Sequence, residues 1–119
     1  MTTKSIDQQS FYIAIALYES TSSNPEDRIL YEECFVLIKA TSLEQAKDRA
    51  WELGRQQKSS YKNGAGSTIS WSLKHIVDVA SVLDEGFENG TELYARHFCN
   101  YEAYYSFEPL LSGESPRTK

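Results

Sequence analysis

The sequence predicts an α+β domain. The predicted domain is an antiparallel sheet of about four to five strands in β-β-α-β-β order, with one main helix packed on one face of the sheet and a C-terminal extension. Two observations support this prediction. Apolar residues alternate with period two in three segments, which is typical of strands, and recur with helical spacing in a fourth. The helical segment follows the first two strand segments, as in α+β domains. The 119 residues fit a single domain.

The first predicted strand covers residues 11–20, FYIAIALYES. Its odd-numbered side chains are large and apolar up to residue 17, and we interpret them as the core face that the helix covers. Its even-numbered side chains are small in the middle, with Tyr12 and Tyr18 at the two ends. A solvated face would carry charges or threonine, so this second face is expected to pack against something.

The second predicted strand covers residues 29–40, ILYEECFVLIKA, after a loop with the turn signal Asn24-Pro25. Both of its faces are apolar, which favours a central strand that is covered on both sides. The face that Cys34 shares with Tyr12 and Tyr18 then needs a cover. The C-terminal extension or a second subunit is expected to supply it.

The helix is predicted over residues 41–58, TSLEQAKDRAWELGRQQK. Ser42 is a favourable N-cap, and Gln45 follows three residues later, as in a capping box. An apolar stripe at helical spacing is rich in alanine, which allows close approach to a sheet. The stripe consists of Leu43, Ala46, Ala50 and Leu53.

The third strand is predicted over residues 68–79, with apolar residues on one face from Ile69 to Val79 and polar residues on the other. The preceding glycines, Gly64 and Gly66, are interpreted as a helix-to-strand connection. A phosphate-binding loop would need a helix after the glycines, and here the helix precedes them. A last strand is predicted over residues 91–98, after a tight Asn89-Gly90 turn.

Three segments follow from these elements. Residues 1–10 are predicted to be a loose N-terminus, residues 11–98 a single α+β domain, and residues 99–119 a C-terminal extension with a polar, disordered end.

The charge balance argues against two kinds of partner. Twelve Lys and Arg residues stand against 17 Asp and Glu, a formal net charge of -5, whereas nucleic acids and anionic membranes attract clustered positive charge. The apolar run near the N-terminus is too short for a signal peptide or a membrane span. We therefore expect a cytoplasmic protein that binds no nucleic acid and no membrane.

No cofactor and no metal are expected. The two histidines and two cysteines do not occur at the spacings of a zinc site. Glu32 and Glu33 are adjacent, so on a strand they point to opposite faces and cannot act as a pair. Asp78 interrupts an apolar run, and we interpret it as a bend where its carboxylate accepts a backbone N–H.

The residues also resemble a known family. The ordered segments LYEE (30–33), SLEQA (42–46), YKNGAG with Trp71 (61–71), IVDV (76–79) and NGTELYAR (89–96) are similar to a family of short bacterial proteins catalogued as domain of unknown function 4288. The resemblance covers roughly residues 11–98. It implies a small, soluble, stand-alone bacterial domain and implies no activity.

We predict from these features a non-catalytic protein-interaction module that forms a homodimer or binds another protein. The alternative is an immunity-type inhibitor that covers a basic toxin with its acidic surface. An enzyme would need a concave pocket in which Glu33, His75, Asp78 or Arg96 converge. The candidate interaction surface, chosen because tyrosine is common at protein interfaces, is Tyr12, Tyr18, Tyr31, Glu32, Tyr94, Tyr101 and Tyr104. The candidate site or structural charges are Glu33, Asp78 and Arg96.

Overall fold

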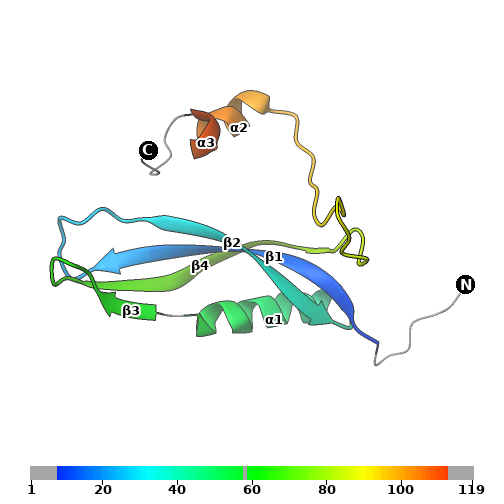
Figure 1. Cartoon of the computed structure of the whole chain (residues 1–119), viewed down its shortest axis with the longest axis horizontal. Coiled ribbons are helices and arrows are strands. Elements are labelled where there is room, and N and C mark those ends of the chain that lie inside the picture. Colours follow the sequence, from blue (N-terminus) through cyan, green and yellow to red (C-terminus); the bar gives the residue numbers. More distant parts are fainter. Residues whose placement is uncertain (1–7, 58, 113–119) are drawn as a thin grey trace, which may run out of the picture.

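The computed structural model describes residues 8–57 and 59–112 as one curled antiparallel sheet with a helix beneath it (Figure 1). The strand order is β2-β1-β4-β3. The predicted α+β class and its β-β-α-β-β order are confirmed. The predicted loose residues 1–7 and polar end 113–119 lie outside the described residues. The elements are β1 (Ser10–Ser22), β2 (Tyr31–Ala40), α1 (Leu43–Gln56), β3 (Ser59–Lys62), β4 (Thr68–Ser81), α2 (Tyr101–Phe107) and α3 (Pro109–Ser112).

β1 is the long central strand of the sheet, and β2 lies at an edge. β1 pairs with β2 from Ser10↔Ala40 to Glu19↔Tyr31 and with β4 along its other side. The prediction that the second strand is central and covered on both sides is therefore wrong. Its two apolar faces have another explanation, because one of them packs on α1 and the other stays largely open.

The helix α1 covers the even-numbered face of β1, so the prediction that it covers the odd-numbered face is also wrong. Tyr12 and Ala14 are buried beneath α1, in a core that includes Ala46 and Ala50 of the helix. Alanines on both sides let the helix backbone approach the sheet closely, whereas large side chains would hold it away. Small residues on a strand face thus indicated helix packing.

The start of α1 follows the predicted capping pattern. The Gln45 N–H donates to Ser42 Oγ at 3.1 Å, and Gln45 Oε1 accepts the N–H of Thr41 at 2.7 Å. The second hydrogen bond of the capping box, from the Gln45 side chain, thus involves the residue before the N-cap. The buried side of α1 is the row Ala46, Ala50 and Gly54. At Gly54 an added Cβ would lie 2.9 Å from Leu73 Cδ2, so glycine permits the close contact with β4.

The segment before β4 is a hairpin, which corrects the prediction of a simple connection. β3 pairs with β4 from Ser59↔Trp71 to Lys62↔Thr68. In the turn, the Asn63 N–H donates to Ser67 O at 2.9 Å, and Gly66 has a φ of 87°, which favours glycine.

The strand predicted at residues 91–98 does not form. The Asn89-Gly90 turn is present, with the Thr91 N–H donating to Glu88 O at 2.9 Å. Beyond it, the Leu83 N–H at the end of the sheet donates to Leu93 O at 3.4 Å, and no ladder of paired residues follows in the described chain. An alternating pattern gives a strand only where a sheet edge lies alongside for pairing.

The face of the sheet opposite α1, called the open face from this point, is covered in part. It contains the odd-numbered side chains of β1 and β2. The Phe87 ring packs on Phe11 with centroids 5.2 Å apart, and Tyr94 packs edge-on against Phe35 at 6.2 Å. Ile15 at the centre is only 1% exposed, yet Phe35 is 60% exposed.

The helices α2 and α3, together called the arm, lie on the side of the sheet opposite α1 (Figure 1). Among the described elements, α2 and α3 contact each other and no strand. The radius of gyration is 17.9 Å, against about 13.5 Å for a compact domain of this length. Among the described helices, none is long and apolar enough to span a bilayer.

Candidate functional site: a groove beside α1

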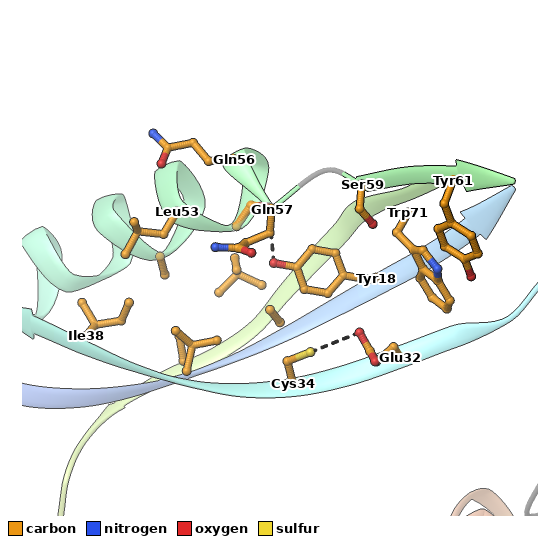
Figure 2. A pocket seen from close by; sticks show the side chains of 16 residues that line it. Tyr18, Glu32, Cys34, Ile38, Leu53, Gln56, Gln57, Ser59, Tyr61 and Trp71 are labelled. Atoms are coloured by element: carbon orange, nitrogen blue, oxygen red, sulfur yellow. Dashed lines mark hydrogen bonds between the residues drawn. The ribbon is translucent and has the colours of Figure 1, made fainter. Parts of the chain in front are cut away.

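The groove exists because α1 is shorter than the strands it covers. Thirteen residues of β1 extend about 44 Å, whereas the 14 residues of α1 rise about 21 Å. The helix therefore covers one half of the face, and the other half remains as a groove of about 810 Å³ at its C-terminal end (Figure 2).

Small and apolar side chains form the inner end of the groove. Ala14 and Ala16 of β1 form part of its floor, and Leu53 of α1 and Ile76 of β4 line it. These residues belong to the same face as the helix core, so the groove continues the core into solvent. Such a surface binds hydrocarbon and gives no catalytic chemistry by itself.

Aromatic and polar side chains form the outer end. Tyr18 and Glu32 are register partners on β1 and β2 and therefore share a face. Trp71 pairs with Ser20 of β1 on one side and Ser59 of β3 on the other. Two residues along β3 from Ser59, Tyr61 extends the same face. Figure 2 shows Tyr18, Glu32, Tyr61 and Trp71 together at this end.

Hydrogen bonds hold the polar groups of the groove. The Tyr18 hydroxyl donates to Gly54 O at 3.3 Å, and burial raises the pKa of this phenol. The Cys34 Sγ–H donates to Glu32 Oε1 at 3.4 Å. Burial, with a smaller effect of the Glu32 carboxylate, raises the pKa of Cys34. Cys34 is therefore a neutral thiol at pH 7 and a weak nucleophile.

The structure separates the predicted interaction surface into four places. Tyr12 is buried in the core beneath α1, so its prediction as an interface residue is wrong. Tyr18 and Glu32 lie in the groove, and Tyr31 and Tyr94 lie on the open face. The remaining two residues of the predicted surface are on α2: Tyr101 and Tyr104.

The contribution of Trp71, Tyr61 and Cys34 to one site was missed. Alternation along β4 was the signal available for Trp71. Two irregularities in the β1–β4 register change the face to which the later residues of β4 point. Leu73 pairs with Tyr18 on the helix side, whereas His75 pairs with Leu17 on the open face. The prediction that these residues share a face is wrong because each bulge moves the later side chains to the other face.

Two of the predicted charges, Asp78 and Arg96, both interact with the Tyr94 side chain. Asp78 lies on the open face, where its Oδ1 accepts the N–H of Val79 at 2.9 Å and its Oδ2 accepts the Tyr94 hydroxyl. The interpretation of Asp78 as a backbone acceptor is confirmed, but the strand does not end there, because β4 continues to Ser81 after a register irregularity beside Asp78. Burial and Asp78 raise the pKa of Tyr94, and Arg96 offsets a smaller part of that rise. Glu33 lies on the open face. Neither these three charges nor His75 lines the groove.

The comparison with known protein families shows which family the chain belongs to. A family model described as Domain of unknown function (DUF4288) matches residues 11–95. The chain belongs to this family. The resemblance of the sequence segments is thereby confirmed. Comparisons with curated proteins and with solved structures found no match. The groove and Tyr94 lie within the matched DUF4288 residues, whereas the arm follows them.

Tyr94 attaches the segment 91–98 to the sheet, and the loss of its hydroxyl is expected to be measurable. Burial, followed by the hydrogen bond to Asp78, raises the pKa of Tyr94. The hydroxyl therefore stabilises the fold below a pH of about 10, and this contribution is lost as the pH rises through the folded-state pKa. Tyr94→Phe should lower the unfolding free energy by about 1 kcal/mol at pH 7.

The difference between wild type and Tyr94→Phe should shrink above a pH of about 10, as measured by urea unfolding. Tyr31→Phe is the matched control, because Tyr31 is an exposed tyrosine on the same sheet face. Equal losses in the two variants, or a difference that grows with pH, would contradict the assigned role of the Tyr94–Asp78 bond.

Proposed function

We propose that this chain is a non-catalytic protein-interaction module that forms a homodimer, in which the arm of each copy covers the open face of the other. The observation that carries the proposal is that one chain exposes two apolar surfaces that do not meet. One surface is on the open face, and the other is on the arm, which contacts no strand of its own chain in the described residues.

The open face presents aromatic and aliphatic side chains to solvent. Phe35 is 60% exposed and Leu37 is 49% exposed, and both lie on the edge strand β2. Tyr31 lies on the same strand and face, separated from this pair by Glu33. Exposed apolar side chains that lie next to each other, as Phe35 and Leu37 do, favour an interaction site.

The arm has a matching composition. Its helices are seven and four residues long, too short to be stable in water without packing. The ring of Phe98, which precedes the arm, stacks on Tyr104 with the ring centroids 4.8 Å apart. The exposed apolar side chains of the arm are Tyr101, Tyr104, Tyr105, Phe107, Leu110 and Leu111.

A second copy is the partner that this arrangement favours. The arm already lies on the side of its own open face but apart from the strands (Figure 1). A two-fold exchange buries both arms and both faces at once, and two-fold dimers are the commonest oligomers. Burial of one phenylalanine contributes about 2 kcal/mol, so a single anchor should alter dimer affinity at least tenfold.

The test is sedimentation equilibrium of the full chain at micromolar concentration. We expect the wild type to have twice the monomer mass of 13.6 kDa, and Phe35→Asp and Phe107→Asp each to shift the equilibrium toward monomer. Tyr61→Asp, an exposed aromatic on the α1 side of the sheet, is the matched control and should leave the mass unchanged.

A mixture of Phe35→Asp and Phe107→Asp tests the exchange itself. In the mixed dimer, one arm–face contact is intact and the other carries both substitutions. Because substitutions within one contact are not additive, the mixture should form more dimer than either variant alone. A monomeric wild type would overturn the homodimer. A dimer that is insensitive to both substitutions would overturn the arm–face interface.

The acidic composition supports a second candidate, an immunity-type inhibitor of a basic toxin. The chain has 17 acidic and 12 basic residues, and complementary charge steers association of such pairs. Rescue of growth when the chain is co-expressed with its basic toxin, lost when surface carboxylates are neutralised, is the expected result. Continued growth arrest would exclude that toxin as the target.

A further inference from the structure

We propose that the groove beside α1 binds a cationic amphiphile, a hydrocarbon chain that ends in an alkylated ammonium group. The hydrocarbon lies along the inner end of the groove, and the ammonium lies at the outer end beside Glu32. This site is on the α1 side of the sheet and does not depend on the proposed homodimer, which uses the opposite face.

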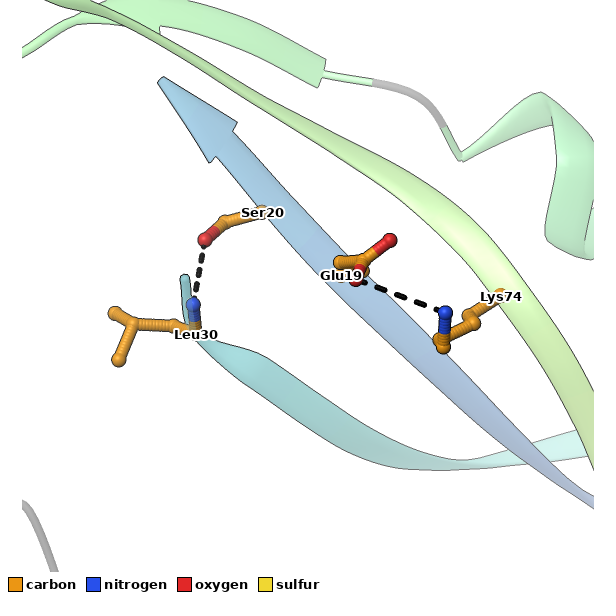
Figure 3. Close-up of polar contacts among 4 residues, drawn as sticks. All are labelled: Glu19, Ser20, Leu30 and Lys74. Atoms are coloured by element: carbon orange, nitrogen blue, oxygen red, sulfur yellow. Dashed lines mark hydrogen bonds and ion pairs between the residues drawn. The ribbon is translucent and has the colours of Figure 1, made fainter. Parts of the chain in front are cut away.

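The charge at the outer end selects a cation. Glu32 is the one charged side chain among the described residues that line the groove. Within the described part of the chain, an ion pair joins Lys74 Nζ to Glu19 Oε2 at 3.6 Å (Figure 3), and Glu32 has no such partner. Its hydrogen bond comes from the Cys34 thiol and not from a cationic side chain. A bound anion would be repelled there.

Aromatic rings at the same end favour an alkylated ammonium in particular. Tyr18, Trp71 and Tyr61 line the groove on the sheet face that carries Glu32 (Figure 2). The Tyr18 hydroxyl is held by Gly54 O, so its ring is fixed in the groove. Ring faces attract quaternary ammonium groups, and aromatic sites next to a carboxylate are typical of their recognition.

The inner end fits hydrocarbon. Its lining includes Val36, Leu53 and Ile76 above a floor of alanines. The volume of about 810 Å³ is in the range of small-molecule sites. A free amphiphile and the side chain of a methylated lysine share this chemistry, and the experiment includes both.

The test is isothermal titration calorimetry with three probes of equal chain length: octyltrimethylammonium, 1-octanol and octanoate. The cation is expected to bind about tenfold or more tightly than the alcohol, and octanoate the most weakly. Equal binding of the three probes, tighter binding of octanoate, or no heat from octyltrimethylammonium would overturn the proposal.

Two charge-neutralising variants locate the site. Glu32→Gln should weaken octyltrimethylammonium about tenfold and leave octanol unchanged. Glu33→Gln is the matched control, because it removes the same charge from the adjacent residue on the opposite face and should have no effect. Both positions are exposed, so folding should be retained, as thermal unfolding would verify. Equal weakening by both variants would overturn the site.

A peptide that carries one trimethyllysine distinguishes the source of the ligand. If it binds as tightly as octyltrimethylammonium and is weakened by Glu32→Gln, the cation comes from a protein side chain. If only the free amphiphile binds, the ligand is a small molecule. Both results retain the ammonium site, and neither changes with the Phe35→Asp substitution that tests the dimer.

Discussion

The substitution Ile15→Ala is expected to lower the free energy of unfolding by about 3 kcal/mol, a large fraction of the total stability of a small domain. Ile15 is 1% exposed and lies on the central strand, between Phe35 of β2 and Asp78 of β4. Removing its side chain leaves a cavity between strands that pair on both sides and cannot collapse freely.

Urea unfolding at one fixed protein concentration measures this loss. Ile29→Ala is the matched control, because Ile29 is 53% exposed and lies outside the strands. The control should change stability by less than about 0.5 kcal/mol. Similar losses at the two positions would mean that Ile15 is not the packed centre of the sheet.

The substitution Ala14→Leu is expected to destabilise the fold by about 2 kcal/mol through overpacking. Ala14 is 1% exposed and belongs to the core cluster that α1 closes with Ala46 and Ala50. A larger side chain at this position would push the helix away from the strands. The interpretation from sequence alone placed Ala14 on a face that needs a cover, and expected the C-terminal extension or a second subunit to supply it.

The matched control for Ala14→Leu is Ala95→Leu, because Ala95 is exposed and lies outside the helices and strands. Its unfolding midpoint in urea should stay close to that of the wild type. If Ala14→Leu is equally stable, α1 does not pack on the even-numbered face and the groove beside it is wrongly placed.

Sequence periodicity predicted the helices and strands well where the local residue pattern determines them. The start of α1 follows from Ser42 and Gln45, and β1 and β4 follow from alternation. The strand at residues 91–98 failed because alternation alone does not provide a sheet edge to pair with. The short strand β3 was missed because its sequence has no apolar alternation, and pairing with β4 creates it.

The candidate site was predictable only in pieces. Tyr18 and Glu32 were predicted as interaction residues, but the groove depends on the register that makes them partners. Trp71 joins them because of its pairing with Ser20, and the irregularity between Leu73 and His75 places His75 on the other face. Register shifts of one residue leave little trace in a single sequence.

The sequence by itself determined the class of fold, the helix with its cap and alanine stripe, and the family to which the chain belongs. Only the tertiary structure decided which face of the sheet α1 covers and how much of that face stays open. The physical reason is that alternation defines two faces equally well. The close approach of alanines and Gly54, and the difference in length between helix and strand, then select the covered face and leave the groove.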